Sequence, residues 1–326
     1  MGFCELFAVI VSADCNRSGA MPLVSIIMNV RNGAPTLREA IDSALAQTFA
    51  NWELIVWDDR SSDKSAELVS SYRDARIRYF LSPDETPLGR ARADAIGRAR
   101  GEWLAFLDQD DVWLPNKLQK QMALAAEGVG LIYGRTVRFY PSGRERDYDH
   151  AHEYELLPEG DIFTQLFTKS CFIAMSSAVF RRSAVESIGG IPQEIRIIPD
   201  YYLYVAVAEK YRARAVQEVV CRYRMHPGSL SQVTAVPMHQ EALWLIEHWG
   251  GCLDLQLVAR CRRRHLTAIA LEEMRSTNTF RRGLIRLFAE GSPGSQLARP
   301  FAFLMHIVRR NLRPPYWRTL GDKPGV

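Results

Sequence analysis

The sequence predicts an α/β fold: a mainly parallel sheet flanked by helices, with a C-terminal helical appendage. Strand-like and helix-like segments alternate four times within about a hundred residues, as in a parallel sheet with helical crossovers. The most informative segment is the apolar run 103–107, which follows Gly101 and stops at a group of acids. Such a run is typical of a strand buried on both faces. From about Pro237 onward the pattern is helical.

The alternating elements occupy the first 130 residues in order. Apolar and β-branched runs predict strands at 23–28, 52–57, 76–80 and 103–107. Apolar residues at helical spacing predict helices at about 37–45, 61–72, 88–99 and 114–126. Thr36 and Glu39 have the spacing of a capping box, in which each side chain bonds to the other residue's backbone at the helix start.

Beyond residue 128 the pattern is looser. Further strands are expected at 129–133, 136–140, 176–180 and 215–224, and a helix at 199–210. The C-terminal helical region has one clear break, at 291–294, where glycine, serine and proline cluster. We therefore expect an N-terminal extension (1–20), a sheet domain (21–234) and a basic helical region (235–326).

Composition limits the class of protein. With 326 residues, 47% apolar and 24% charged, the chain is an ordinary globular protein and not a disordered or fibrous one. The six cysteines have no CxxC spacing, which favours reduced thiols in the cytoplasm and no zinc site. No apolar run approaches the roughly 20 residues that span a bilayer. From Arg260 onward, fourteen Lys and Arg face four Asp and Glu, which indicates a basic tail.

Polar side chains stand where three of the expected strands end. They are Asn29, Asp59 and the pair Asp108 and Asp110. Because parallel strands end at one edge of a sheet, and open α/β sheets bind ligands there, we expect these side chains to converge. A divalent cation that bridges two carboxylates to a phosphate relieves their repulsion. The alternatives are an ordinary Asp-rich turn and, for Asp59, an N-cap of the helix that Ser61 begins.

Three segments carry a more specific pattern: VSIIMNVRNGAPTLREAIDSALAQTFANWELIVWDDRSSD (24–63), GRARADAIGRARGEWLAFLDQDD (89–111) and YRMHPGSLS (223–231). In this order and spacing they resemble the family 2 glycosyltransferases of the GT-A fold. The resemblance covers about 23–231, two thirds of the chain. It implies transfer of a sugar from a nucleotide-diphosphate donor, UDP- or dTDP-linked, with inversion at the anomeric carbon and with Mg²⁺ or Mn²⁺ as cofactor. The implied acceptor is a hydroxyl of a glycan or lipid-linked sugar in cell-surface polysaccharide synthesis.

The resemblance also implies a nucleotide-binding set. Asp59 matches the acid that holds the base, Arg92 matches an arginine near the nucleotide, and Asp108 matches the acid that contacts the ribose or the metal. Arg31 stands where the family often has an aromatic residue, and its guanidinium plane can stack on the base as well. Asn29 completes the expected set.

The remaining implied roles concern metal and catalysis. Asp108 and Asp110 match the family's DxD metal-binding motif, and His226 matches a late histidine that reaches the metal or the diphosphate. Asp200 matches the general base that takes a proton from the acceptor hydroxyl. A positioned carboxylate of this kind contributes about 10²–10⁴-fold to a rate.

Each of these residues has a structural alternative. Asp200 lies in the first turn of its expected helix, where the helix dipole favours a carboxylate. His226 precedes Pro227 and could order a turn, and Arg92 could lie on a solvated helix face beside Arg90. Asp111 is expected to support its neighbours or to cap the helix at 114 and not to bind metal.

Three departures from the family pattern leave the donor open, and the first is Arg31, which leaves the identity of the base undecided. Arg60 replaces a small residue after the paired acids, where it can crowd or contact the nucleotide. Pro199 replaces an acid that often precedes the general base, which removes one carboxylate near the acceptor.

The C-terminal region suggests a membrane surface. Apolar residues at helical spacing between Phe301 and Leu312, next to Arg309, Arg310 and Arg313, form an amphipathic basic helix. Such a helix either rests on anionic lipid, on the inner face of the plasma membrane, or packs on the rest of the protein.

Three other functions compete with a glycosyltransferase activity. A nucleotide-dependent oxidoreductase would carry GxGxxG after its first strand, and residues 30–35 do not supply it. A non-catalytic module of the same fold that binds a nucleotide sugar or glycan remains the alternative. No nucleic-acid reader motif accompanies the arginines.

Overall fold

A computed structural model describes residues 24–140, 142–147, 154–168, 171–226 and 235–275. These residues fall into two compact units, divided between Thr234 and Ala235. Within the described ranges, no helix combines the length and the apolar character that crossing a membrane requires. The expected extension 1–20 lies outside them.

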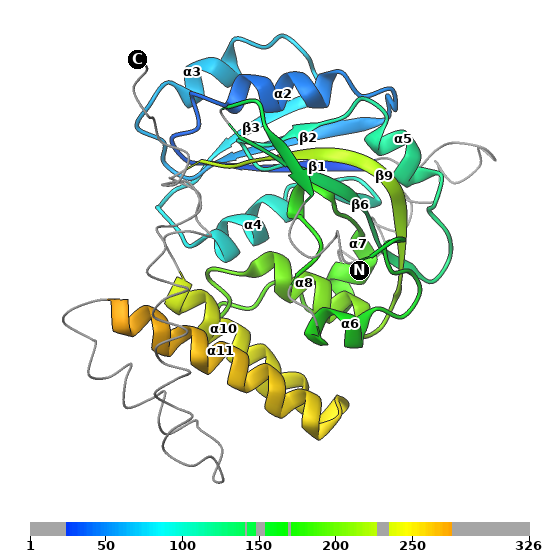
Figure 1. Cartoon of the computed structure of the whole chain (residues 1–326). Coiled ribbons are helices and arrows are strands. Elements are labelled where there is room, and N and C mark those ends of the chain that lie inside the picture. The colour runs from blue at the N-terminus through cyan, green and yellow to red at the C-terminus, as the bar shows by residue number, and fades with distance from the viewer. Residues whose placement is uncertain (1–23, 141, 148–153, 169–170, 227–234, 276–326) are drawn as a thin grey trace, which may run out of the picture. The chain divides into compact units, whose positions relative to one another are not determined.

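The first unit is built on a nine-stranded sheet (Figure 1). Its parallel half has the strand order β3-β2-β1-β4. The bounds of these strands are β1 Val24–Val30, β2 Trp52–Asp58, β3 Ile77–Leu81 and β4 Trp103–Phe106. The predicted α/β class with a parallel core is therefore confirmed.

The other half of the sheet is mixed. β8 pairs antiparallel with both β4 and β6, β6 pairs parallel with β9, and β5 and β7 pair antiparallel with β9 and β6. The bounds are β5 Val112–Trp113, β6 Val129–Phe139, β7 Glu145–Asp147, β8 Val179–Arg181 and β9 Arg212–Arg224.

Two predictions for this half were wrong. The segments 129–133 and 136–140 form one strand, because shifts of register near Gly134 let β6 continue alongside β9. The predicted strand at 176–180 starts only at Val179, since Met175–Ser177 forms a 3₁₀ turn.

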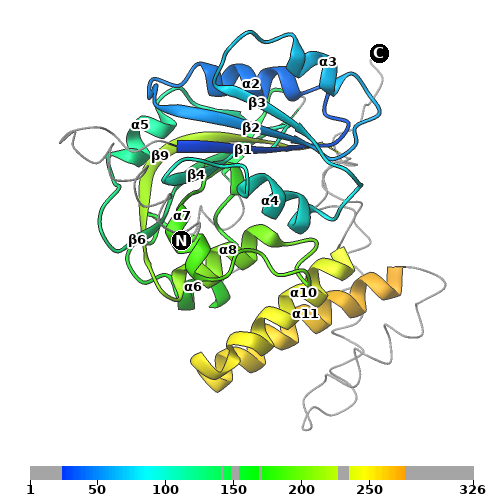
Figure 2. The ribbon, with the colours of Figure 1, turned by 180° about the vertical axis from the view of Figure 1, so that it is seen from behind.

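Helices cover both faces of the parallel half, as Figures 1 and 2 show from opposite sides. α2 (Leu37–Leu45) and α3 (Ser65–Ser70) lie over one face, and α4 (Leu88–Ile96) lies over the other. Successive side chains of a strand point to opposite faces. This cover therefore explains why every residue of β2 is buried.

The described part of the first unit holds four further helices. They are α5 Lys117–Met122, α6 Phe163–Thr168, α7 Arg182–Ser187 and α8 Pro199–Ala208. Eight of the ten residues of α8 are buried, so this helix belongs to the core. Its first turn, which carries Asp200, is correspondingly fixed.

One predicted helix start and one predicted helix cap were wrong, because in each case a side chain has another partner; α2 itself begins at Leu37 as predicted. The helix expected from Ser61 begins at Ser65, where Asp63 accepts a 2.9 Å hydrogen bond from the Ser65 N–H. The capping box at Thr36 is not formed. The Thr36 side chain makes no cap hydrogen bond, and Glu39 forms an ion pair with Arg224.

The described part of the second unit is a helix pair, α10 (Ala235–Trp249) and α11 (Leu255–Arg275). The prediction of unbroken helix up to residue 291 was wrong, because a 3₁₀ turn, Gly250–Cys252, separates the two. Asp254 then starts α11 by accepting hydrogen bonds from the Gln256 and Leu257 N–H groups at 2.9 and 3.0 Å. The break at 291–294 and the amphipathic segment 301–313 lie outside the described residues.

Gly89 joins α4 to the chain that leads into α8. Its N–H donates a 3.3 Å hydrogen bond to the Arg196 carbonyl. A Cβ at this position would lie 1.9 Å from the Ile195 carbonyl oxygen, so only glycine allows the two backbones to approach this closely.

We expect Gly89→Ala to lower the free energy of unfolding by about 1–3 kcal/mol, because the clash falls on main chain that can move only as a unit. Urea denaturation measures this change. Gly97→Ala, at the other end of α4, is the control: the nearest atom to its added Cβ is the Asp94 carbonyl oxygen at 3.3 Å. Equal losses in the two variants would contradict a special role for Gly89.

Candidate active site

The acidic residues after β4 form a tight turn at the carboxyl edge of the parallel strands. The Asp111 N–H donates to the Asp108 carbonyl at 3.1 Å, which closes the turn. The Asp108 and Asp110 side chains are 33% and 23% exposed, whereas Asp111 is buried. Two carboxylates thus face outward and one faces the interior.

Arg92 lies beside this turn. Its side chain is buried, and Nη2 donates a 2.8 Å hydrogen bond to Asp108 Oδ1. Its Nη1 is buried with no hydrogen-bond partner. The alternative of a solvated helix face is therefore wrong for Arg92 but right for Arg90, which is exposed and pairs with Asp94.

Asp200 is the second residue of α8 and lies within electrostatic reach of both Arg92 and Asp108. Burial raises the pKa of its carboxyl above the ordinary value, the Arg92 charge opposes this shift, and the Asp108 charge adds to it. Asp200 Oδ1 also accepts a 2.8 Å hydrogen bond from the Tyr201 N–H. Asp200 thus bonds to the first turn of its helix, as the structural alternative expected, and also lies in the site.

The charge of Arg92 is balanced by these two acids. Burial lowers the pKa of a guanidinium, but the carboxylates of Asp108 and Asp200 outweigh this effect and raise it. Segments far apart in sequence thus meet around one buried cation.

His226 follows β9 and contacts the acidic turn. Its Nε2 lies 2.8 Å from Asp110 Oδ2. Burial and the Asp108 charge raise the pKa of Asp110, and His226 opposes this shift. The turn that His226 was alternatively expected to order lies in 227–234, outside the described residues.

Asp111 supports the turn from inside. Its Oδ2 accepts from the Ser176 hydroxyl at 2.6 Å, and its Oδ1 accepts from the Arg224 N–H at 2.9 Å. Burial, together with the Asp110 and Asp108 charges, raises its pKa well above the ordinary value. Capping of the next helix is excluded, since Asn116 stands at the N-cap of α5.

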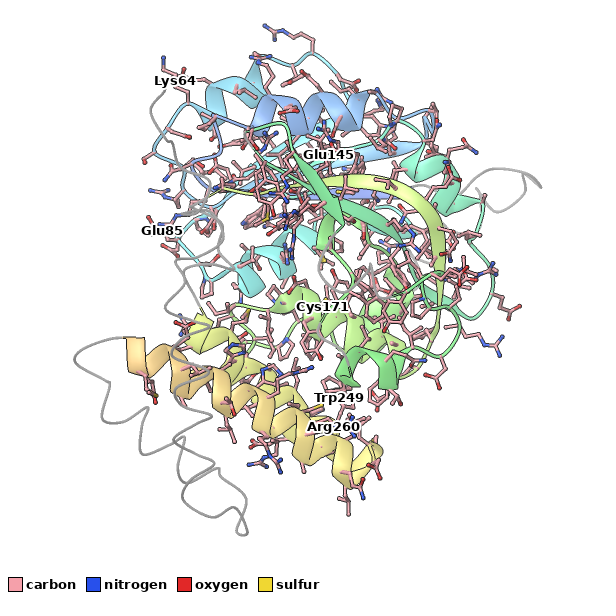
Figure 3. The ribbon with its side chains drawn as sticks, viewed as in Figure 1. Lys64, Glu85, Glu145, Cys171, Trp249 and Arg260 are labelled. Atoms are coloured by element: carbon pink, nitrogen blue, oxygen red, sulfur yellow. The ribbon has the colours of Figure 1, made fainter. Side chains whose placement is uncertain are left out.

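Asp59 lies in a second group, at the end of β2. Its Oδ1 accepts from the Thr86 N–H and hydroxyl at 2.9 and 3.1 Å, and its Oδ2 is 3.6 Å from Arg31 Nη1. The N-cap alternative is wrong, because α3 begins later and Asp63 serves its start. Arg31 also pairs at 2.5 Å with Glu85, which lies at the outer edge of the loop after β3 (Figure 3).

Gln109 connects the two groups. Its amide oxygen accepts from the Arg31 N–H at 2.9 Å, and its amide nitrogen donates to the Arg31 carbonyl at 3.2 Å. Gly33 makes room for it, because a Cβ there would lie 2.4 Å from the Gln109 amide oxygen.

Asn29 is the penultimate residue of β1 and is half-buried. Its side-chain Nδ2 is buried with no hydrogen-bond partner. Asn29 is paired in register with Trp57 of β2, whose indole N–H is likewise unpartnered. Asn29 therefore lies at the predicted sheet edge, and its Nδ2 is available to donate a hydrogen bond to a ligand.

Within the described residues, no group of three or more His, Cys, Asp or Glu side chains is arranged to hold a metal ion. The donors here are fewer: Asp110 Oδ2 and His226 Nε2, 2.8 Å apart, with Asp108 alongside. Neighbouring ligands of an octahedral ion with bonds of about 2.0–2.1 Å lie roughly 2.9 Å apart. The set therefore fits Mg²⁺ or Mn²⁺ that takes its other ligands from phosphate and water, and does not fit an all-protein cage.

Four contributors to this region were not predicted from the sequence: Ser176, Arg224, Thr86 and Gln109. Ser176 accepts from the Asp108 N–H at 3.1 Å and donates to Asp111, so a single hydroxyl holds both ends of the turn. Gln109 and Arg224 lie inside the pattern segments 89–111 and 223–231 but were given no role there, whereas no motif marks Ser176 or Thr86.

A model of a known protein family matches half of this chain. Residues 25–189, half of the chain, match the family model described as Glycosyl transferase family 2.

The chain is a family 2 glycosyltransferase.

Two relatives of this glycosyltransferase are enzymes of Escherichia coli. WfgD, a UDP-Glc:alpha-D-GlcNAc-diphosphoundecaprenol beta-1,3-glucosyltransferase, is 30% identical over 219 residues, which are 64% of this chain and 79% of WfgD. WfaP, of the same description, is 32% identical over 215 residues, 65% of this chain and 80% of WfaP.

Solved structures establish the GT-A fold of this glycosyltransferase. S. aureus TarS 1–349 in complex with UDP-GlcNAc has a TM-score of 0.60 at 16% identity, covering 75% of this chain and 72% of TarS 1–349. The mannosyltransferase PcManGT from Pyrobaculum calidifontis, in complex with GDP-Man and Mn²⁺, has a TM-score of 0.59 at 19% identity, covering 97% and 90% of the two chains.

Ser176→Ala is expected to lower the free energy of unfolding by about 1.5–3 kcal/mol, because it leaves the buried Asp111 carboxylate without one of its donors. Ser177→Ala is the matched control. Ser177 is equally buried in the same 3₁₀ turn, but its hydroxyl donates to the Ala174 carbonyl at 2.8 Å and not to an acid. Chemical denaturation of both variants measures the difference, and a larger loss in Ser177→Ala would contradict the assignment.

Proposed function

We propose that this glycosyltransferase moves a hexose, with inversion, from a UDP-linked donor to a hydroxyl of a lipid-linked sugar during cell-surface polysaccharide synthesis. The observation that carries the proposal is the grouping of Asp200 and Asp108 around the buried guanidinium of Arg92. It sets a potential base beside the acids of the DxD motif. A glycan- or nucleotide-sugar-binding module would need the nucleotide side of this site but no base.

Asp200 is the proposed general base. Its raised pKa makes its carboxylate a better proton acceptor than an ordinary aspartate. The bond from the acceptor oxygen to the anomeric carbon forms as the bond to the diphosphate breaks, and the hydroxyl proton passes to Asp200. Because Asp200 comes from α8 and the DxD acids follow β4, base and leaving group can lie on opposite faces of the sugar.

Asp110 and His226 are the proposed ligands of Mg²⁺ or Mn²⁺, with Asp108 beside them. When bound, the ion would neutralise charge that develops on the leaving diphosphate. Arg92 orients Asp108, and its unpartnered Nη1 is a donor that a nucleotide oxygen can use.

Asp59 and Arg31 are the proposed base-binding residues. Among the described residues, Asp59 Oδ2 meets Arg31 Nη1 at 3.6 Å, beyond hydrogen-bond distance, so it can accept a hydrogen bond from a pyrimidine N–H. The exposed Arg31 guanidinium supplies a plane on which the base can stack. Asn29 Nδ2 adds an unused donor at the same edge. WfgD and WfaP are described as using UDP-Glc, which supports a uridine-linked donor for this chain.

The acceptor proposal follows from the same relatives, whose printed acceptor is a GlcNAc-diphosphoundecaprenol. A sugar on such a lipid is presented at a bilayer surface. This supports a cytoplasmic enzyme that touches the inner face of the plasma membrane through the basic amphipathic segment predicted at 301–313.

Asp200→Asn is expected to reduce kcat for sugar transfer by about 10²–10⁴-fold, since the amide cannot take the acceptor proton. Binding of UDP and Mn²⁺ is expected to persist. Initial rates of UDP release measure the first effect, and calorimetry measures the second. Asp94→Asn, which removes the carboxylate that pairs with Arg90 on α4, is the control. A kcat within a few-fold of wild type for Asp200→Asn would exclude Asp200 as the base.

The pH profile supplies an independent check. An ordinary aspartate has a pKa of 3.8, and the pKa of Asp200 is raised above this value. The fall of kcat on the acid side of the pH profile should therefore occur at a higher pH than an ordinary aspartate would cause. Residual activity of Asp200→Asn should lack this limb.

A panel of UDP-glucose, dTDP-glucose and GDP-mannose, each with and without Mn²⁺, tests the donor by thermal shift. A donor at 100 times its Kd stabilises the folded state by about 2.7 kcal/mol. The largest increase in Tm is expected for UDP-glucose with Mn²⁺. A larger increase with GDP-mannose would contradict the uridine assignment.

A further inference from the structure

We propose that Arg224 is a positioning residue that fixes the Asp110–Asp111 turn relative to His226, and thereby sets the affinity of the site for its metal ion. The inference rests on the proposed metal site. Neither the family match, which ends at residue 189, nor the sequence patterns assign Arg224 a role.

Arg224, the last residue of β9, holds the turn at two points. Its backbone N–H donates to Asp111 Oδ1 at 2.9 Å, and its side-chain Nε donates to the Asp110 carbonyl at 2.7 Å. Its Nη2 forms an ion pair with Glu39 of α2. The guanidinium thus ties the turn after β4 to a helix on the sheet.

The contact continues into the next two residues. The Met225 N–H donates to the Phe139 carbonyl at 2.9 Å, and His226 Nε2 lies 2.8 Å from Asp110 Oδ2. Residues 224–226 therefore touch the turn through a main-chain donor, a guanidinium and an imidazole. Without the hydrogen bond from Arg224 Nε to the Asp110 carbonyl, the distance between Asp110 Oδ2 and His226 Nε2 can change.

Such a change matters because the affinity for a metal ion depends on where its ligand atoms lie. Ligand atoms must lie within about 0.2 Å of ideal distances for tight metal binding. Loss of the groups that orient metal ligands typically weakens affinity 10–100-fold.

Arg222 provides a matched control on the same strand. Its guanidinium lies 4.5 Å from the Phe139 ring, compared with 4.4 Å for Arg224, and it also forms an ion pair, with Glu145 at 2.7 Å. Glu145 belongs to β7 and is labelled in Figure 3. Replacing Arg222 thus removes the same ring contact and an equivalent ion pair, but not the hydrogen bond to Asp110.

The test is Mn²⁺ binding in the presence of UDP, measured on the full chain by the electron paramagnetic resonance signal of free Mn²⁺. Arg224→Met is expected to raise the Kd for Mn²⁺ about 10–100-fold, whereas Arg222→Met should leave it within about twofold of wild type. Thermal melting of both variants separates this effect from a general loss of stability. Should Arg224→Met fail to fold, Arg224→Lys decides, since one ammonium cannot replace the fork that serves both Asp110 and Glu39.

Equal Mn²⁺ affinity in Arg224→Met and Arg222→Met, or unchanged affinity in Arg224→Lys where Arg224→Met does not fold, would overturn the role of Arg224. Failure of the wild-type protein to bind Mn²⁺ in the presence of UDP would instead refute the proposed metal site, and the role of Arg224 would fall with it. The two failures are therefore distinguishable.

Discussion

The buried guanidinium of Arg92 is the constraint on which the site depends. A buried charge is tolerated only when it is paired and hydrogen-bonded. Asp108 supplies the hydrogen bond at 2.8 Å, and Asp200 adds its charge from α8. Meeting this requirement brings α4, the turn after β4 and the start of α8 together. Gly89 permits it, since no other residue would let α4 approach Ile195 so closely.

The parallel sheet also explains why the acidic turn lies near the loops that carry Arg31 and Asp59. β1, β2 and β4 end at one edge, so the loops that follow them are neighbours. Gln109 joins two of these loops by bonding to both main-chain groups of Arg31, and Ser176 and Arg224 brace the turn from the mixed half of the sheet. The parallel half thus supplies the acids, while the mixed half keeps them in place.

Much of this could be predicted because it follows from local pattern. The alternation of strand and helix segments predicted a mainly parallel sheet. Parallel strands alone predicted that the residues at the ends of β1, β2 and β4 share an edge. The partners of polar side chains could not be predicted, since they depend on packing between distant segments. Glu39 matched a capping box but pairs with Arg224, and Asp59 matched an N-cap but accepts from Thr86. Ser176 belongs to an ordinary residue type without periodic spacing, so no local signal marks it. Arg224 lies inside the pattern segment 223–231, but that pattern does not name its partners.

The most direct measurement is the anomalous difference map of a crystal grown with UDP and Mn²⁺. The predicted result is a Mn²⁺ peak bound by Asp110, with Arg92 still paired to Asp108 and Asp200 on the far side of the sugar-binding space. A peak away from Asp110, or an Arg92 side chain turned out to solvent, would contradict the central role of the buried guanidinium.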